Sequence, residues 1–271
     1  MPTVVLITGG SSGLGEAIAS HLARFARYKV YATSRRCSFG ENRNGVTFLP
    51  LDLTQSHSIE QAAHWMREKE GRVDVLINNA GVGFAGPLIH TTRSEIHAVM
   101  ETNLYGVLDV CSSFFTLLPQ PGGKIIQISS LAGRFGLPFR GVYSSSKFAL
   151  EGLTESLSQE LSQFGISVVL VEPGDFNTQI SQNRGRSEVP PESPFSHQFE
   201  RTYEMINDEV ARSYPAAYLA AKLEPIIRNP RPRLRYVIGS PFQRFTLILK
   251  ALLPQRLFER LINHHYQIPN P

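Results

Sequence analysis

Short apolar segments alternate with amphipathic ones along the first 180 residues of the chain. Residues 4–9, VVLITG, form a β-branched run that ends at glycines, and residues 14–25 place apolar side chains at helical spacing. The alternation continues with apolar runs, which predict strands, at 29–34, 46–51, 73–81, 124–130 and 166–174, and with helical patterns at 58–69, 94–118 and 142–164. Strands this apolar need helices on both faces, so the pattern predicts an α/β protein with a doubly wound parallel sheet.

One segment interrupts this alternation. Residues 179–213 carry Pro190, Pro191 and Pro194 amid polar residues, which predicts a long mobile connection rather than core. We expect this segment to act as a substrate lid. No break in composition or long linker divides the chain, so residues 1–271 are predicted to form a single domain.

The C-terminal part of the chain is basic and amphipathic. Residues 233–239, RLRYVIG, predict a last strand, and residues 240–271 form a helical extension of two short amphipathic pieces hinged at Pro254. Residues 228–260 contain eight Lys or Arg residues and a single acid, Glu259. This pattern fits a solvated basic face. It also fits a surface that shapes the mouth of an apolar site or rests on a membrane. Nothing in it supports binding to nucleic acid.

Composition narrows the class of protein further. At 271 residues, with 42% hydrophobic and 18% charged, the chain has the balance of a globular protein with a sizeable core. Cys37 and Cys111 offer no disulfide framework, and the eight histidines form no cluster with them, so we expect no metal site. The first residues lack the pattern of a signal peptide, and no apolar stretch reaches the about eighteen residues of a membrane span. The sequence therefore predicts a cytoplasmic protein whose contact with a membrane, if it has one, is peripheral.

A glycine cluster, TGGSSGLG, runs from Thr8 to Gly15 between the first strand and the first helix. Glycines in this context allow a tight turn and a close approach of the backbone to phosphate, and the helix N-terminus supplies N–H groups and partial positive charge. No Lys-Ser/Thr follows at P-loop spacing, which disfavours triphosphate chemistry. A merely flexible turn is the alternative. The cluster predicts a dinucleotide site at Gly9, Ser11, Ser12, Gly13, Leu14 and Gly15.

The end of the second strand favours NADP over NAD. Dinucleotide folds place an acid there to bind a ribose 2′-hydroxyl or a basic residue to bind a 2′-phosphate. This chain has Ser34, Arg35 and Arg36 at that place, and no acid. Two guanidinium groups can form charge-assisted hydrogen bonds with a 2′-phosphate, to which Ser11 and Ser12 can add hydroxyl donors. Arginines that only face solvent are the alternative.

Residues 142–148, VYSSSKF, place Tyr143 four residues before Lys147. If the segment is helical, the two side chains lie on one face, either as an ordinary surface contact or as a tuned acid. Other motifs decide between these readings. The chain contains further motifs besides this one. In chain order, the whole set is the glycine cluster, LPLDLT at 49–54, NNAG at 78–81, Asn103, Ser130 with Gly133 three residues on, YSSSK at 143–147 and PGDFNT at 173–178.

In these motifs and their order the chain resembles the short-chain dehydrogenase/reductase family, which has a Rossmann fold, over residues 3 to about 180. The stretches VYATSRR, VDVLINNAG, GLPFRGVYSSSKFALEG and RPRLRY are most similar to its NADP-dependent hydroxysteroid and retinol dehydrogenase branch. The resemblance implies a catalytic tetrad of Asn103, Ser130, Tyr143 and Lys147. It also implies cofactor contacts from Asp52, Leu53, Asn79, Ala80, Gly81, Tyr143, Lys147, Pro173, Gly174, Phe176 and Thr178.

Each tetrad residue has a chemical role in carbonyl reduction. Hydride transfer leaves negative charge on the carbonyl oxygen, and Tyr143 is the candidate that protonates it. We expect the Lys147 ammonium and the oxidised nicotinamide to lower the pKa of Tyr143, and Lys147 to hold the nicotinamide ribose. Ser130 orients the substrate oxygen. The resemblance implies that Asn103 holds a water that links Lys147 to solvent.

Bland alternatives exist for three of these residues. Ser130 serves equally as a cap at a strand end, Asn103 as a helix residue that satisfies backbone groups, and Tyr143 as a half-buried aromatic with its hydroxyl in water.

The leading hypothesis is an NADP(H)-dependent oxidoreductase that interconverts a carbonyl and an alcohol on a lipophilic steroid, retinoid or long-chain keto compound. A non-enzymatic regulator or scaffold that binds dinucleotide on the same fold is the main rival. A lipid-handling protein built around the basic tail is a third reading. Family resemblance implies a homodimer or homotetramer paired through residues 94–118 and 142–164.

Overall fold

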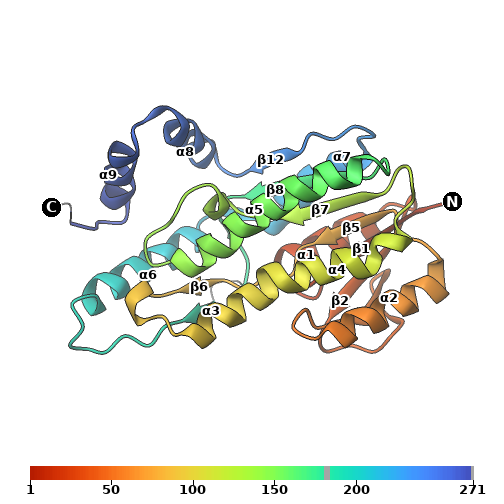
Figure 1. Cartoon of the computed structure of the whole chain (residues 1–271), viewed down its shortest axis with the longest axis horizontal. Coiled ribbons are helices and arrows are strands. Elements are labelled where there is room, and N and C mark those ends of the chain that lie inside the picture. Colours follow the sequence, from red (N-terminus) through yellow and green to blue (C-terminus); the bar gives the residue numbers. More distant parts are fainter. Residues whose placement is uncertain (180–183, 270–271) are drawn as a thin grey trace.

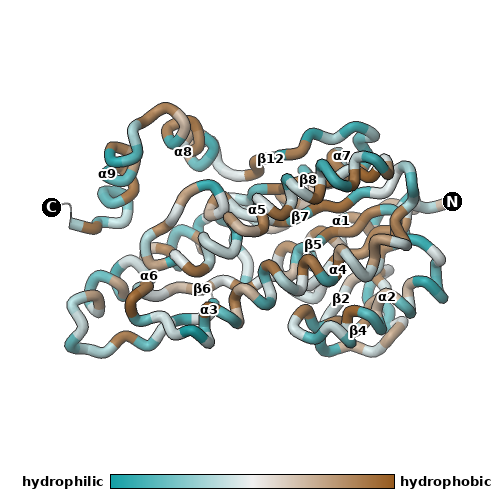
Figure 2. The backbone as a smooth tube through the Cα atoms, viewed as in Figure 1, coloured by the Kyte–Doolittle hydropathy of each residue, from teal (hydrophilic) through white to brown (hydrophobic). Residues whose placement is uncertain are grey.

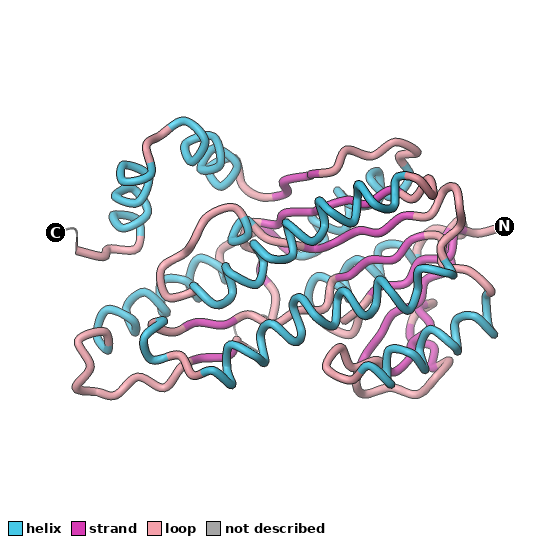
Figure 3. The backbone as a smooth tube through the Cα atoms, in the orientation of Figure 1, coloured by secondary structure: helices cyan, strands magenta, loops and turns pink. Residues whose placement is uncertain are grey.

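The computed structural model describes residues 1–179 and 184–269. An eight-stranded sheet forms the centre, with helices on both faces (Figures 1 and 3). Its strands are β1 (Thr3–Ile7), β2 (Tyr28–Ser34), β3 (Glu41–Arg43), β4 (Val46–Pro50), β5 (Val75–Asn78), β7 (Lys124–Ile128), β8 (Ser167–Pro173) and β12 (Arg235–Ile238). All neighbouring pairs are parallel except β3 and β4. The predicted α/β fold with a doubly wound, mainly parallel sheet is confirmed.

The spatial order of the strands is β12-β8-β7-β5-β1-β2-β4-β3. From β1, the chain builds outward through β2 and β4, and then returns to β5 on the other side of β1 and builds outward through β7, β8 and β12. The order therefore reverses between β1 and β5. A ligand crevice is expected outside the carboxyl ends of the strands at such a switch point.

Helices cover each face of the sheet through apolar side chains. On one face, α1 (Gly13–Ala23) and α7 (Ala216–Arg228) pack side by side through residues such as Ile18 and Leu223. On the other face, α2 (Ser56–Glu70), α4 (Gly106–Phe114) and α5 (Gly141–Ser162) cover the strands. The central strands β1, β5, β7 and β8 are buried over nearly their whole length, and hydrophobic residues make up much of them (Figure 2). Burial on both faces explains why the predicted strands lack a polar alternation.

The predicted helix at 94–118 is one continuous rod of several segments. It begins as α3 (Arg93–Met100), passes through a π-helical turn at Glu101–Tyr105 and continues as α4, with a 3₁₀ turn at Phe115–Leu117. Thr92 caps its start, because its side chain accepts a hydrogen bond from the N–H of Glu95 while the Glu95 carboxylate returns one to the Thr92 N–H. The π-helical turn carries Asn103.

The segment 179–213 differs from its prediction. It contains a helix, α6 (Ser196–Ala211), that the sequence pattern had assigned to a connection, and Phe199, Thr202, Ile206 and Val210 of this helix are buried. The expectation of few core residues is therefore wrong for this helix. Residues 180–183 lie outside the described residues, and the expectation that 179–213 moves as a lid stays a prediction.

A second helix, α7, was also not predicted. Pro225 interrupts its pattern, yet Leu219, Leu223 and Ile226 lie at helical spacing and are buried. Two pairs of short strands lie outside the main sheet in the described part of the chain: β6 (Phe84–Ala85) pairs with β10 (Gly185–Arg186), and β9 (Phe176–Asn177) pairs with β11 (Tyr214–Pro215).

The C-terminal extension consists of α8 (Pro241–Leu252) and α9 (Gln255–His265), separated by Pro254 as predicted. Both helices project beyond the sheet near β12 (Figure 1). Phe258 of α9 packs on Leu131 and Phe135, whereas α8 has no fully buried residue. Large apolar side chains of the two helices are exposed: Phe242, Phe245, Ile248, Leu252, Leu257 and Leu261. No described helix has the length and apolar character needed to cross a membrane.

Candidate functional site

A cavity of about 670 Å³ opens at the carboxyl ends of the strands, at the switch point between β1 and β5. Its walls combine residues that are far apart in sequence but follow neighbouring strands. The cavity is lined by these residues from the predicted site: Gly9, Ser11, Ser12, Gly13, Leu14, Arg35, Arg36, Asp52, Leu53, Asn79, Ala80, Gly81, Ser130, Tyr143, Lys147, Pro173, Gly174, Phe176 and Thr178. Of the predicted residues, Gly15 and Asn103 do not line it.

The glycine turn after β1 has the geometry expected of a phosphate cradle. Gly9 and Gly13 have φ angles of 66° and 58°, a region that side chains rarely adopt. A Cβ on Gly15 would lie 2.3 Å from the Gly9 carbonyl oxygen and 2.4 Å from Asn79 Nδ2, so only glycine fits there. Gly15 thus acts through packing, and the N-terminus of α1 opens directly onto the cavity.

Hydrogen bonds fix the two strand ends at the switch point. Thr8 Oγ1 accepts from the N–H groups of Asn79 and Ala80 at 3.0 and 3.1 Å. The Asn79 side chain donates in turn to the carbonyl oxygens of Thr8 and Gly9 at 3.0 and 3.2 Å. The NNAG motif therefore holds the glycine turn in place as well as lining the cavity.

At the end of β2 the cavity is lined by Arg35 and Arg36, which are exposed and make no ion pair with any described residue. After β4, the neighbour of β2 in the sheet, Asp52 Oδ1 accepts from the N–H and hydroxyl of Thr54 at 3.0 and 2.9 Å. The loop after β4 is thus ordered by its own side chains. Both guanidinium groups remain available to an anionic ligand.

Tyr143 and Lys147 lie one turn apart near the start of α5, as the sequence predicted. The Lys147 Nζ atom lies 6.0 Å from the centroid of the Tyr143 ring. Lys147 is buried and donates to the carbonyl oxygen of Ile128, at the end of β7, over 2.9 Å. Burial lowers the pKa of Lys147 to about 8, and the nearby Glu151 carboxylate partly opposes this effect.

Tyr143 differs electrostatically from its prediction. Burial raises the pKa of Tyr143, whereas a hydrogen bond with Ser130 and the charges of Arg140 and Arg184 lower it less strongly. The expected net lowering by Lys147 does not appear in the protein alone. A raised pKa keeps the phenol protonated at neutral pH, which suits a group that donates a proton.

Ser130 has two hydrogen-bonding functions. Its Oγ atom accepts from the N–H of Ala132 at 3.1 Å and so caps the 3₁₀ turn at Leu131–Gly133. Its hydroxyl also bonds with Tyr143. The cap predicted as a bland alternative is therefore real, and it holds the hydroxyl beside Tyr143 rather than excluding a chemical role.

Asn103 lies behind the cavity wall and is 1% exposed. Its Oδ1 accepts from the N–H of Val82 at 2.8 Å, and its Nδ2 donates to Val82 O at 2.9 Å and Ser146 Oγ at 3.0 Å. Both Asn103 Oδ1 and Lys147 Nζ lie within 4 Å of a Cβ built on Gly81. The residue thus positions the loop after β5 and the helix of Lys147, and its role in holding a water stays a prediction.

The sequence missed several residues at the catalytic end of the cavity. Arg140, Asp175, Arg184 and Val210 line it together with Tyr143. Arg140 stands three residues before Tyr143, so its sequence position was a usable signal. Arg184 and Val210 lie in the segment assigned to a connection, where no motif marked them. No described residues form a cluster of His, Cys, Asp and Glu fit to hold a metal ion.

Comparison with known proteins places this geometry in context. The family profile described as short chain dehydrogenase matches residues 3–189. The chain is 38% identical to a 3-ketodihydrosphingosine reductase of Bacteroides thetaiotaomicron, over 98% of this chain and 99% of that protein. It is 35% identical to human 17-beta-hydroxysteroid dehydrogenase type 1, over 89% and 78% of the two chains.

A solved short-chain dehydrogenase from Streptomyces avermitilis has the same fold, with a TM-score of 0.81 and 27% identity over 98% of this chain and 97% of that one. The family match covers more than half of this chain, and the human relative falls in the branch that the sequence resembles. This chain therefore belongs to the short-chain dehydrogenase/reductase family of oxidoreductases, in the hydroxysteroid and retinol dehydrogenase branch.

Proposed function

We propose that this protein is an NADP(H)-dependent oxidoreductase that interconverts a carbonyl and an alcohol on a lipophilic compound. The observation that carries the proposal is the grouping of Ser130, Tyr143 and Lys147 in the cavity onto which the glycine turn opens. A protein that only sensed dinucleotide would need the turn but not a protonated phenol beside a serine hydroxyl. The rival function, a non-enzymatic regulator, predicts cofactor binding without turnover.

The side chains divide the chemistry between them. A bound nicotinamide cofactor supplies or accepts the hydride. Ser130 donates a hydrogen bond to the substrate oxygen, and Tyr143 gives that oxygen a proton during reduction or removes one during oxidation. Lys147 donates to the Ile128 carbonyl oxygen and brings a positive charge to the cavity wall. Its remaining N–H donors are offered to the cofactor ribose. Burial of Tyr143 favours the protonated phenol that reduction requires.

Arg35 and Arg36 support NADP rather than NAD as the cofactor. Neither guanidinium has a carboxylate partner among the described residues, and both line the cavity where the second strand ends. Replacing Arg35 with Asp should weaken NADPH binding about 10- to 100-fold and leave NADH binding comparatively unharmed, since a charge-assisted hydrogen bond contributes roughly 1.5–3 kcal/mol.

The matched control is Arg93→Asp, which makes the same change of charge at an exposed position outside the cavity. Dissociation constants of NADPH and NADH, measured by titration of each variant, give the comparison. Tighter binding of NADH than of NADPH by the parent protein would rule out the NADP assignment.

The lipophilic substrate is supported by apolar residues at the catalytic end, where Val82, Phe84 and Val210 join the cavity wall. The name of the Bacteroides relative, a 3-ketodihydrosphingosine reductase, supports a long-chain keto compound within this class. A screen of steroid, retinoid, long-chain keto and small aldehyde substrates with NADPH, followed at the nicotinamide absorbance, tests the proposal directly. Turnover confined to small aldehydes would contradict it.

We also propose that two copies of the chain pair through the helices at residues 93–118 and 141–162. The π-helical turn and α4 expose the large apolar side chains of Tyr105 and Leu108, and α5 exposes that of Phe148. Charged replacements at Leu108 and Phe148 should convert the assembly to monomers in analytical ultracentrifugation. A parent protein that sediments as a monomer at micromolar concentration would end this proposal.

The exposed apolar side chains of α8 and α9, interspersed with Arg244, Lys250, Arg256 and Arg260, support peripheral contact with an anionic membrane. Figure 2 shows hydrophobic and hydrophilic residues mixed along both projecting helices. The first turn of α8 also reaches the site, because Gln243 Nε2 donates to Asp175 Oδ2 at 2.7 Å. Cosedimentation with anionic and neutral vesicles, with the extension present and deleted, tests the contact.

A further inference from the structure

Arg140 is a buried cation at the catalytic end of the cavity. It lies at the N-cap of α5, three residues before Tyr143, and its side chain lines the cavity although the residue is only 9% exposed. One guanidinium nitrogen, Nη2, donates to the hydroxyl of Tyr266, whose ring centroid lies 5.5 Å from the Arg140 Cζ atom. The Nε atom is buried and has no hydrogen-bond partner among the described residues. A buried cation without a carboxylate partner is costly, so Arg140 calls for an explanation.

Arg184 lines the same cavity as Arg140 and Tyr143, although it follows Tyr143 by 41 residues in the sequence. Its Nη1 atom donates to Asn207 Oδ1 at 2.9 Å, and its Cζ atom lies 5.7 Å from the centroid of the Tyr203 ring. Burial and then the charge of Arg140 lower the pKa of Arg184, so the two cations are close enough to repel each other. We call Arg140 and Arg184 the pocket arginines.

Acidic neighbours do not neutralise the pocket arginines by contact. Burial lowers the pKa of Arg140, whereas the charges of Asp175 and Glu209 are among those that raise it. Asp175 accepts instead from Gln243, and Glu209 pairs with His265 Nε2 at 2.8 Å. Among the described residues, neither Arg140 nor Arg184 forms an ion pair with any carboxylate.

We propose that the substrate carries an anionic oxygen group, a carboxylate or a phosphate, within a few bonds of its carbonyl, and that the pocket arginines bind this group. The inference rests on the proposed carbonyl reduction and narrows its substrate to anionic amphiphiles such as long-chain keto acids. Neutral steroids and retinoids, which have no such group, would leave both guanidinium groups without an anionic partner. An oxyanion in the cavity can accept hydrogen bonds from the guanidinium groups that line it, and it separates the two positive charges by a negative one.

Two simpler roles explain less. Anchoring the C-terminal segment through Tyr266 needs one hydrogen bond, and a neutral donor would suffice for it. The other role is to raise the acidity of Tyr143. Burial raises the pKa of Tyr143 more than Arg140 and Arg184 lower it, so the two charges do not make the phenol acidic in the protein alone. Neither role accounts for two guanidinium groups in the same cavity wall that have no carboxylate partner among the described residues.

The test compares substrates that share a chain and a carbonyl but differ in charge. Reduction by the full-length protein with NADPH is measured for 3-oxo and 4-oxo fatty acids, for their methyl esters and for amino ketones of equal length. The acids should have kcat/KM values about 10- to 100-fold above those of the esters, as expected for one or two charge-assisted hydrogen bonds. Equal values for acids and esters, or a preference for the amino ketones, would overturn the inference.

Variants show whether the pocket arginines are responsible. Arg184→Met should lower the ratio of kcat/KM for the acids to kcat/KM for the esters about 10-fold or more, whereas Arg186→Met should leave this ratio unchanged. Arg186 is a suitable control because it is an exposed arginine two residues away that pairs with Glu200 outside the cavity. Arg140→Lys keeps the charge and should retain part of the preference. If Arg184→Met slows acids and esters equally, the arginine acts on Tyr143 and the inference fails.

A binding measurement separates this inference from the proposed reaction. Calorimetric titration with decanoate, decyl phosphate, decanol and decylamine, in the presence of NADP⁺, requires no turnover. Decanoate or decyl phosphate should bind at least tenfold more tightly than decanol, and the difference should disappear in Arg184→Met; the tighter of the two anions identifies the head group. Anion binding without any turnover would refute the reaction alone, and turnover without anion selectivity would refute the inference alone.

Discussion

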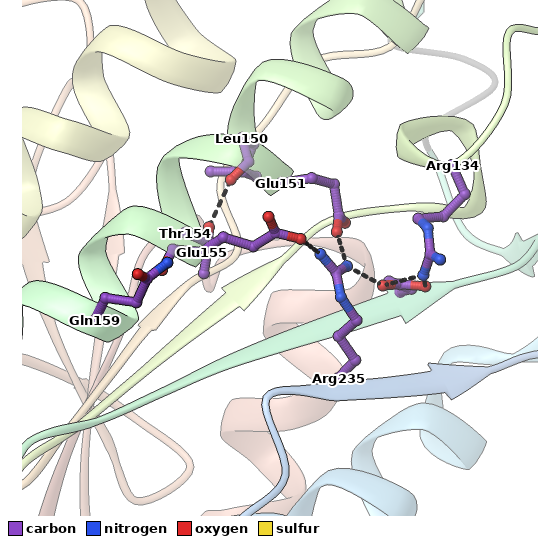
Figure 4. Close-up of polar contacts among 8 residues, drawn as sticks. Arg134, Leu150, Glu151, Thr154, Glu155, Gln159 and Arg235 are labelled. Atoms are coloured by element: carbon purple, nitrogen blue, oxygen red, sulfur yellow. Dashed lines mark hydrogen bonds and ion pairs between the residues drawn. The ribbon is translucent and has the colours of Figure 1, made fainter. Parts of the chain in front are cut away.

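Two groups of arginines in this protein differ in whether carboxylates pair with them: Arg134 and Arg235, which we call the paired cluster, and the pocket arginines. Around β8 and β12, Arg134 and Arg235 pair with three carboxylates, those of Glu151, Glu155 and Glu172 (Figure 4). Glu172 is 0% exposed and receives Arg134 Nη1 at 3.0 Å and Arg235 Nη1 at 2.7 Å. In the cavity, the pocket arginines are also buried or half-buried, but they have no carboxylate partner among the described residues.

The contrast separates charge used for folding from charge kept for a ligand. A buried carboxylate such as Glu172 destabilises the fold unless cations are held against it, and the side chains around it provide two. Arg140 is almost as buried, yet among the described residues it has no carboxylate partner, and it lies beside the groups that carry the proposed chemistry. Substitutions at the paired cluster should therefore change stability, and substitutions at the cavity should change turnover and binding.

The largest effect is expected at Tyr143. Tyr143→Phe keeps the ring and its packing but removes the group placed to protonate the substrate oxygen, so single-turnover hydride transfer should fall by about 10²- to 10⁴-fold. NADPH affinity and thermal stability should change little. Tyr218→Phe, on the exposed surface of α7, is the matched control. Near-normal transfer by Tyr143→Phe would reduce the Tyr143–Lys147 motif to an ordinary helix contact.

Substitution in the paired cluster should lower stability and leave turnover nearly unchanged. Arg235→Met leaves Glu151 and Glu172 buried with one cation fewer, and should lower the free energy of unfolding by about 3 kcal/mol. Turnover per folded molecule should stay near that of the parent. Arg212→Met, which breaks an exposed pair with Asp208, should change stability by less than about 0.5 kcal/mol. Urea denaturation of both variants measures the difference, and equal stabilities would show that the buried network adds nothing.

The smallest predicted effect is a dependence on pH set by Lys147, whose pKa is lowered to about 8 in the folded protein. Above pH 8 the ammonium loses its proton, so NADPH affinity should fall by at most about tenfold per pH unit. Stability should move the other way. Because the folded pKa lies below the unfolded value, this group's contribution is present above the unfolded pKa and is lost as pH falls through about 8.

Both trends should disappear in Lys147→Met, apart from changes due to other groups. The pocket arginines stay charged throughout this range, so any pH dependence of anion binding between pH 7 and 9 should be weaker than that of NADPH binding. Equal pH profiles for the two ligands would assign the trend to a group other than Lys147.

Local pattern was sufficient for the sheet and for the nucleotide side of the cavity. Strands buried on both faces read as short apolar runs, and the tight turn between the first strand and the first helix requires the positive φ angles of Gly9 and Gly13. Tyr143 and Lys147 were predictable for a similar reason, because one helical turn fixes their spacing. The prediction failed at α6 and α7, whose buried faces are interrupted by polar residues and by Pro225.

What the sequence by itself determined is therefore the alternation of strands and helices as far as β8, the phosphate turn, the Ser130–Tyr143–Lys147 motif and the basic residues after the second strand. Only the tertiary structure decided the electrostatics of the site. Burial, not the nearby ammonium, sets the direction of the Tyr143 pKa, and Asn103 faces the backbone of Val82 instead of the cavity. Arg235 pairs with carboxylates, whereas Arg140 bonds with Tyr266 and has no carboxylate partner among the described residues. This difference depends on neighbours up to 126 residues away, so no local pattern records it.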